Sequence, residues 1–157
     1  MPTPEGFMRL AVDAAVGGVE LGRGGPFGAV VVREGAVVAT GVNEVTALND
    51  PTAHAEIQAI RRACIVLGRF SLEGCAVYAS CEPCPMCLGA LAWARVDAVY
   101  FAATRLQAAA AGFDDVRFHD ELGKPPAERA LRVEHLPVAG AERPFAAWLR
   151  KADRVPY

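Results

Sequence analysis

Two short segments, separated by a predicted helix and a predicted strand, constrain this sequence more than any other feature. The first is His54-Ala55-Glu56, and the second, residues 80–87, reads Ser-Cys-Glu-Pro-Cys-Pro-Met-Cys. One histidine and two cysteines can hold a tetrahedral zinc ion and leave its fourth position open for water. An open position is typical of catalytic metal sites, whereas structural sites are closed by a fourth protein ligand. We therefore predict a catalytic metal centre built from both segments.

Together the two segments match the pattern H-x-E…P-C-x-x-C of zinc enzymes that deaminate nucleobases. Pro83 directly precedes Cys84, so the predicted zinc ligands are His54, Cys84 and Cys87. Glu56 is not needed as a ligand. It is predicted to move protons from an activated water to a ring nitrogen of the base and then to the leaving amine. The pattern indicates hydrolytic removal of an amine and leaves the substrate open.

The spacing of these residues also predicts where they stand on their helices. His54 and Glu56 are roughly 200° apart around a helix, so they cannot share a lateral face. They can converge at a helix N-terminus, and Cys84 and Cys87 can do the same at the start of the next helix. The positive ends of two helix dipoles then stabilise an anionic site. We expect two helix N-termini to face one metal ion.

Hydrophobic spacing predicts an α/β domain in which helices cover a sheet. A polar, irregular segment is expected over residues 117–128. The expected helices span residues 4–22, 54–67, 85–94 and 142–152. The expected strands span residues 27–32, 36–42, 75–79, 98–102 and 131–136.

Length and composition narrow the class of protein. A chain of 157 residues predicts a single domain over residues 1–157. The net charge of −2 gives no general attraction to nucleic acid or to an anionic membrane, so neither is expected as a partner. Five cysteines, an odd number with three clustered, indicate thiolate ligation in a reducing compartment. With no long apolar run in the sequence, we expect a soluble cytoplasmic protein.

Beyond the metal segments, the chain resembles the cytidine-deaminase-like superfamily, and within it the bacterial guanine deaminases. The metal segments are shared with tRNA adenosine deaminases and do not separate the two. The narrower resemblance rests on the Gly-Gly-Pro-Phe-Gly entry, the Gly-Phe-Asp-Asp segment and the terminal tyrosine. The matching parts of the chain are residues 24–30, Asn43, residues 49–56, residues 81–90, residues 111–115 and Tyr157.

This resemblance implies a three-layer α/β/α fold around a five-stranded mixed sheet. It implies a homodimer in which the C-terminal segment, about residues 131–157, is exchanged so that each tail closes the partner's site. It also implies zinc as the cofactor, a purine base as the partner molecule, and the conversion of guanine and water to xanthine and ammonia in purine metabolism.

The resemblance assigns the purine contacts to Phe27, Asn43, Asp115 and Tyr157, the last from the partner chain. The chemistry suits guanine, because an aromatic ring stacks on a purine, a carboxylate accepts its N–H groups and an amide both donates and accepts. Each residue has a plainer alternative. Phe27 fits a strand core, Asn43 a turn, Asp115 a helix cap and Tyr157 a frayed terminus.

Three other functions remain open from the sequence. A tRNA adenosine deaminase needs a positive surface, and the basic segment 150–154 favours it. A cytosine deaminase of similar size is a second alternative. A non-catalytic zinc module is a third, and it predicts a fourth protein ligand such as Cys81. Because Cys81 lacks the preceding proline, we expect it to be a neighbouring buried thiol instead.

Overall fold

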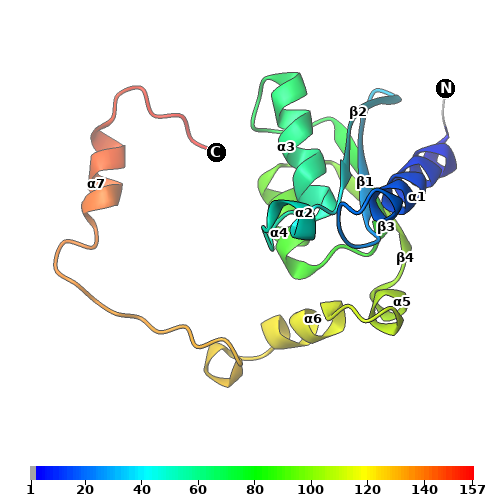
Figure 1. Ribbon diagram of the computed structural model, residues 1–157. Coiled ribbons are helices and arrows are strands. Elements are labelled where there is room, and N and C mark those ends of the chain that lie inside the picture. Colours follow the sequence, from blue (N-terminus) through cyan, green and yellow to red (C-terminus); the bar gives the residue numbers. More distant parts are fainter. Residues whose placement is uncertain (1–2) are drawn as a thin grey trace.

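Four strands form a mixed sheet at the centre of the molecule (Figure 1). The computed structural model describes residues 3–157. β1 pairs antiparallel with both β2 and β3, whereas β3 and β4 run parallel. Glu34 and Gly35 connect β1 to β2 with positive φ angles of 51° and 75°, as a tight hairpin turn requires. In sheet order the strands are β2 (Ala36–Val42), β1 (Gly28–Arg33), β3 (Cys75–Cys81) and β4 (Ala98–Ala103).

Helices surround this sheet and continue beyond it toward the C-terminus (Figure 1). The predicted helices and the first four predicted strands are confirmed, with ends that differ by a few residues. In chain order the helices are α1 (Pro4–Glu20), α2 (Val45–Leu48), α3 (Ala55–Leu67), α4 (Pro85–Trp93), α5 (Arg105–Ala110), α6 (Asp115–Gly123), the 3₁₀ helix η1 (Pro126–Glu128) and α7 (Arg143–Arg150).

Alternate side chains of the strands build two cores, one on each face of the sheet. On one face Phe7 and Ala11 of α1 pack with Val30 of β1 and Tyr78 of β3. On the other face Val31 of β1 packs against α3 and α4. The buried alanines of α3 on this face are Ala55, Ala59 and Ala63. The expected three-layer α/β/α arrangement is therefore present.

The expected five-stranded sheet was wrong, because the described part of the chain forms a sheet of four strands. Residues 131–136, expected as the fifth strand, are extended but unpaired. Leu131, Val133 and Leu136 of this segment are exposed. A strand needs a neighbouring strand for its backbone hydrogen bonds, and this segment lies away from β4 in its own chain (Figure 1).

The segment expected to be irregular, residues 117–128, is also different. Most of it is helical, since α6 runs to Gly123 and η1 follows. Its polar composition reflects exposure, because none of the residues of α6 is buried. With nine residues, α6 is shorter than the roughly 11–18 residues over which a helical pattern is recognised in a sequence.

Gly41 of β2 brings the sheet and α3 into direct contact. A Cβ atom at Gly41 would lie 2.1 Å from the carbonyl oxygen of Ala55 and 2.5 Å from the nitrogen of Ala59. These atoms are backbone and cannot rotate away. Glycine at this position therefore fixes how closely the first turn of α3, which follows His54, approaches the sheet.

We expect Gly41→Ala to lower the free energy of unfolding by about 1–3 kcal/mol, because the added methyl group overpacks the contact with α3. Chemical denaturation followed by circular dichroism measures the change. Gly17→Ala in α1 is the matched control, since a Cβ there meets nothing within 4 Å. That helix substitution is expected to stabilise by about 0.5–1 kcal/mol. Equal effects of the two substitutions would contradict the packing explanation.

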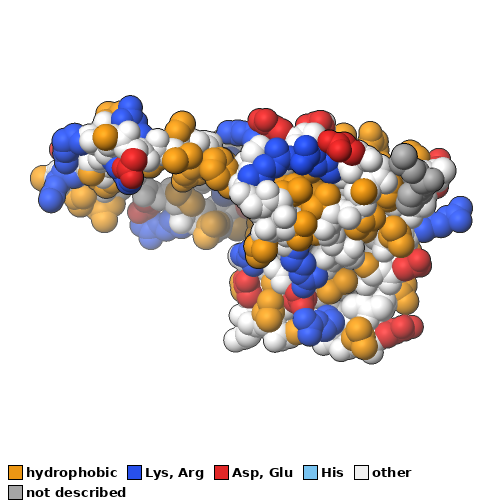
Figure 2. All heavy atoms as spheres, turned by 90° about the horizontal axis from the view of Figure 1, so that it is seen from above, with side chains coloured by type: hydrophobic (Ala, Val, Ile, Leu, Met, Phe, Trp, Pro, Cys, Tyr) orange, Lys and Arg blue, Asp and Glu red, His pale blue; other side chains and the backbone are white. Residues whose placement is uncertain are grey.

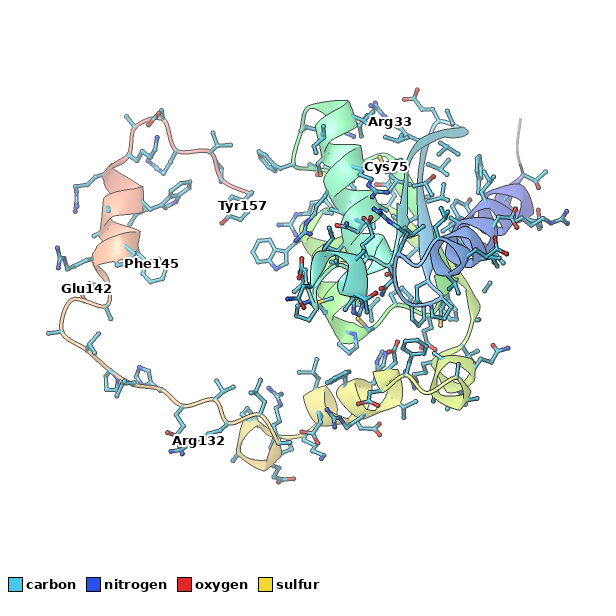
Figure 3. All side chains as sticks on the ribbon, in the orientation of Figure 1. Arg33, Cys75, Arg132, Glu142, Phe145 and Tyr157 are labelled. Carbon is cyan, nitrogen blue, oxygen red and sulfur yellow. The ribbon has the colours of Figure 1, made fainter. Side chains whose placement is uncertain are left out.

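Residues 124–157, which we call the arm, leave the body of the molecule as an extended segment carrying η1 and α7 (Figure 1). The hydrophobic side chains of the arm are exposed, as Figure 2 shows for many of them. Figure 3 shows Phe145 projecting from α7 and Tyr157 at the end of the chain, back toward the body. The exposed apolar side chains of the arm include Leu131, Val133, Leu136, Val138, Phe145, Trp148, Leu149, Val155 and Tyr157.

Within residues 3–157, no helix combines the length and the apolar character that crossing a bilayer requires.

Candidate active site

Two helix N-termini meet on the face of the sheet covered by α3 and α4. His54 occupies the N-cap position of α3, and Cys84 occupies the N-cap position of α4. Neither side chain forms a capping hydrogen bond with its own helix. Both are therefore free to turn toward each other, and Cys87 joins them from the first turn of α4. The predicted end-on arrangement of the two helices is present.

The three predicted zinc ligands lie at distances that suit zinc. The Nδ1 atom of His54 is 3.5 Å from Sγ of Cys84 and 3.6 Å from Sγ of Cys87. All three atoms lie within 4.8 Å of one another. When a nitrogen atom and a sulfur atom bind the same tetrahedral zinc ion at usual bond lengths, they lie about 3.6 Å apart. The donor set and its spacing fit this metal.

Hydrogen bonds among the three ligand side chains shift the pKa of each. The pKa of Cys84 is lowered to about 4, because the Cys87 thiol donates a hydrogen bond to its thiolate and His54 lies beside it. The pKa of His54 is raised, first by its hydrogen bond with Cys84. The pKa of Cys87 is raised because it supplies the proton shared with Cys84 and because it is buried. A divalent cation replaces such protons, since a coordinating thiol is deprotonated outright.

Glu56 stands beside the ligand set in a nearly water-free position. Its exposed fraction is 7%, and burial raises the pKa of its carboxyl group. The Oε2 atom of Glu56 lies 3.5 Å from Sγ of Cys87. A carboxyl group whose pKa is raised by burial holds a proton more readily than an exposed one, as a proton carrier in catalysis must. Its position suits the predicted proton transfer.

Cys81 differs from the two ligand cysteines in its contacts. Its Sγ atom donates to the backbone oxygen of Thr104 across 3.6 Å. Burial raises the pKa of this thiol to about 11, so it keeps its proton. Among the described residues, the cluster able to hold a metal consists of His54, Cys84 and Cys87, without Cys81. This geometry does not favour the four-ligand zinc module.

A cavity of about 280 Å³ opens in front of the ligand set. It is lined by His54, Glu56 and Cys84 at its base. Three of the four predicted purine contacts also line it, and they come from three separate parts of the fold. These are Phe27 before β1, Asn43 after β2 and Asp115 at the start of α6.

Hydrogen bonds to its side-chain oxygen hold Asn43 in place. It is 6% exposed, and its Oδ1 atom accepts hydrogen bonds from the backbone nitrogens of Gly25 and Val45, each at 3.1 Å. The acceptor of this amide is therefore occupied, and only its Nδ2 group remains to donate. Of the donor and the acceptor expected from Asn43, the structure leaves the donor free.

Phe27 is paired with an aromatic residue that the sequence interpretation did not select. The rings of Phe27 and Phe113 lie 4.8 Å apart at an interplanar angle of 81°, which is an edge-on contact. Phe27 also packs against the core on the α3 face, so it is both core and cavity wall. Phe113 was present in the Gly-Phe-Asp-Asp segment used for the resemblance, and that segment was the only signal for it.

Asp115 is the first residue of α6, whereas Asp114 takes the N-cap position. Burial raises the pKa of Asp115, and the nearby Cys84 raises it further. Asp115 is therefore a cavity residue close to the ligand set, and the helix cap, which was its plainer alternative, is Asp114. Glu82 and Phe118 also line the cavity. Neither was predicted, since only the folded chain brings them to this place.

Tyr157 lies away from the cavity of its own chain. Its ring is 6.3 Å from that of Phe70 and 5.9 Å from that of Trp93. Trp93 is the last residue of α4, and Cys84 precedes the first. A helix of this length separates its two ends by about 13 Å. The structure does not bring Tyr157 to the other predicted site residues within one chain.

Known proteins share the sequence and the fold of this chain. Residues 1–103 match the family model for the cytidine and deoxycytidylate deaminase zinc-binding region. The chain belongs to this deaminase family. The deaminase is 51% identical over 153 residues to a guanine deaminase of Bacillus subtilis, covering 98% of each chain. An X-ray structure of guanine deaminase from Bacillus subtilis matches it with a TM-score of 0.95 at 50% identity, covering 99% of both chains.

A more distant relative carries the alternative substrate in its name. The deaminase is 35% identical over 147 residues to a tRNA-specific adenosine deaminase of Aquifex aeolicus, covering 94% of each chain. Family membership and the His-Cys-Cys cluster confirm the prediction of a zinc-dependent hydrolytic deaminase. The cofactor of this deaminase is zinc.

Proposed function

We propose that this deaminase converts guanine and water to xanthine and ammonia. The observation that carries this proposal is the similarity to the guanine deaminase of Bacillus subtilis, which at 51% identity exceeds the 35% identity to the tRNA-specific adenosine deaminase of Aquifex aeolicus. It covers 98% of the chain and so continues past residue 103, where the shared zinc-binding region ends. The later residues include Phe113 and Asp115, which line the cavity.

The metal end of the cavity performs the proton transfers. When bound by His54, Cys84 and Cys87, zinc supplies an acidified water, whose pKa it can bring to about 7. Glu56 takes one proton from this water and delivers it to the ring nitrogen beside the amino-bearing carbon C2 of guanine, while the water oxygen forms a bond to C2. Glu56 then takes the remaining proton from that oxygen and delivers it to the amine, so that the bond between C2 and the amine breaks, a carbonyl forms at C2 and ammonia leaves. Its raised pKa lets the carboxyl group carry the proton between these steps.

The remaining cavity residues orient the purine. The ring of Phe27 offers a stacking surface, and Phe113 fixes its angle by the edge-on contact. Asn43 donates from Nδ2 to an acceptor on the purine, since its oxygen is occupied. Asp115 accepts from the N1–H or amino group of guanine. Adenine has an acceptor at N1 and leaves Asp115 unpaired there, which disfavours it.

An assay of ammonia release tests this proposal. The purified zinc enzyme is offered guanine, adenine, cytosine and a tRNA anticodon stem-loop at matched concentrations. We expect turnover on guanine to exceed that on each of the others by at least about 10²-fold in kcat/KM. Release of ammonia from the stem-loop but not from guanine would overturn the proposal in favour of a tRNA adenosine deaminase. Turnover on cytosine alone would favour a cytosine deaminase, the second alternative.

We also propose that the arm is exchanged in a homodimer, so that Tyr157 closes the cavity of the partner chain. The exposed apolar side chains of the arm support this, because contiguous apolar surface of this kind marks an interaction site. The position of Tyr157 outside its own cavity supports it as well. In this proposal the whole of residues 1–157 acts as one domain, and the clustered thiols support a reducing, cytoplasmic location.

Deletion of residues 155–157 is expected to lower kcat/KM on guanine by roughly tenfold, because the partner's cavity loses its aromatic cover. Zinc content and melting temperature are expected to stay unchanged. Tyr157→Phe is the matched control, since it keeps the ring, and it should retain most of the activity. Unchanged kinetics after the deletion would contradict a role for Tyr157.

Mixed dimers test the exchange itself. One chain carries Glu56→Gln with an intact tail, and the other carries an intact Glu56 without residues 155–157. In an exchanged dimer, one site of each mixed pair joins an intact Glu56 with an intact Tyr157. Random pairing then restores about a quarter of the wild-type activity. Without exchange, each site of a mixed dimer carries one of the two defects, so mixing the chains restores no activity.

A further inference from the structure

Glu44 is a buried carboxylate that the proposed reaction does not use. It directly follows Asn43, and its exposed fraction is only 2%. Its Oε1 atom accepts from the guanidinium group of Arg23. Its Oε2 atom accepts from Nε2 of Gln58 and, at 2.8 Å, from Nη2 of Arg62. The carboxylate is therefore satisfied on both oxygens by three side chains.

These partners come from elements that surround the cavity. Arg23 lies in the loop between α1 and β1, while Gln58 and Arg62 lie on α3. The backbone nitrogen of Glu44 also donates to the oxygen of Ala53 across 2.9 Å. Glu44 thus connects three parts of the fold. These are the loop between α1 and β1, residues 21–27, which we call the entry loop, the end of β2, and α3.

The Arg23 contact closes a small ring of interactions around the amide of Asn43. Arg23 holds the side chain of Glu44, and two residues later the nitrogen of Gly25 donates to Oδ1 of Asn43 across 3.1 Å. The backbone oxygen of Arg23 accepts from the nitrogen of Ala47 across 3.2 Å. Glu44 is adjacent to Asn43, and Arg23 is two residues from Gly25. A movement of Arg23 therefore displaces the nitrogen of Gly25, which orients the amide of Asn43.

Arg62, the second arginine bound to Glu44, contacts a different part of the fold from Arg23. Nη1 of Arg62 donates to the backbone oxygen of Thr40 across 2.8 Å, on the part of β2 that precedes the cavity residues. Neither Arg62 nor Thr40 lines the cavity. The side chains of Arg23 and Arg62 are 47% and 44% exposed. Two arginines of similar exposure therefore hold one carboxylate, and only one of them touches the entry loop.

The carboxylate is kept charged in this position. Burial on its own raises the pKa of Glu44, but the hydrogen bonds from Gln58 and Arg23 and the charge of Arg62 lower it by more, so the pKa lies below its usual value. A buried ion pair is a weak source of stability compared with apolar packing, and it is better suited to fixing one geometry. The geometry fixed here is that of the loop beside Asn43.

We propose that Glu44, acting through Arg23, is a positioning residue that holds the Asn43 amide toward the substrate. This inference rests on the proposed function, in which Asn43 donates to the purine. Glu44 touches neither substrate nor metal, so its loss acts on binding. KM is expected to rise while kcat, which depends on His54, Glu56 and the cysteines, stays near its wild-type value.

Arg23→Met and Arg62→Met form the decisive pair, because each removes one arginine from the same carboxylate. Steady-state kinetics on guanine, zinc content and melting temperature are measured for both variants. We expect Arg23→Met to raise KM by about tenfold with kcat within about threefold, and Arg62→Met to change KM by less than about twofold. Both are expected to lower the melting temperature similarly and to keep zinc.

Glu44→Gln provides a rescue test beside Glu44→Ala. Glutamine keeps one acceptor for Arg23, so its KM should fall between those of the wild type and Glu44→Ala. Equal KM values for Arg23→Met and Arg62→Met, or a loss in kcat without a rise in KM, would overturn the inference. Inactivity of the wild type on guanine counts against the proposed function instead. The same pair is then compared on whichever base the wild type deaminates.

Discussion

Replacement of Glu56 by glutamine is expected to lower kcat on guanine by about 10²- to 10⁴-fold, which is the usual contribution of a positioned general acid–base group. Glutamine has nearly the same shape and fits the same buried position, where Glu56 is 7% exposed. It cannot take up or release a proton. Zinc content and melting temperature should therefore stay at their wild-type values while turnover is lost.

Glu82→Gln is the matched control for this experiment, because Glu82 is a second carboxylate that lines the same cavity. Glu82 accepts from the backbone nitrogen of Arg105 across 3.0 Å and from its Nη1 across 3.3 Å. Its role is to hold the start of α5, and an amide oxygen can serve it in part. We expect kcat to fall less than about tenfold in Glu82→Gln. A Glu56→Gln enzyme that keeps wild-type turnover would contradict the assigned role of Glu56.

The metal end of the site was predictable because its geometry is local. His54 and Cys84 each precede a helix, so the spacing of the ligands within each segment decides which side chains gather at the helix start. The order of strands and helices then brings the two segments to one face of the sheet. Little beyond the sequence pattern is needed to place these atoms.

The cavity wall depended on contacts between distant parts of the chain. Nothing in the sequence near Asn43 indicates that the nitrogen of Gly25 occupies its oxygen, and this contact decides that the amide donates. The pairing of Phe113 with Phe27 likewise joins residues far apart in the chain. Such side-chain roles follow from tertiary structure and leave no periodic pattern.

The fifth strand shows a different limit of sequence interpretation. Alternating apolar residues over 131–136 fit a strand locally, but a strand exists only when another strand pairs with it. Within one chain that segment belongs to the arm and faces solvent. A local pattern does not reveal whether a pairing strand is available, and within residues 3–157 no strand pairs with residues 131–136.

Cys84→Ala and Cys81→Ala are expected to separate a metal ligand from its neighbour. Both side chains are buried to the same degree, with an exposed fraction of 7% each. Without Cys84, zinc content should fall below about a tenth of an ion per chain. Activity on guanine should then fall by at least about 10³-fold, because the water is no longer acidified. Cys81→Ala should keep its zinc and most of its activity, with a loss of stability of about 1 kcal/mol.

The reason for this difference is the protonation state of the two thiols. The pKa of Cys84 is lowered to about 4 by the hydrogen bond from Cys87, so it is ready to bind a cation as a thiolate. The pKa of Cys81 is raised to about 11 by burial, and its proton is donated to the oxygen of Thr104. Inductively coupled plasma mass spectrometry of the purified variants measures the zinc. Loss of zinc from Cys81→Ala would instead indicate a fourth protein ligand, and with it a closed site that leaves no position for water.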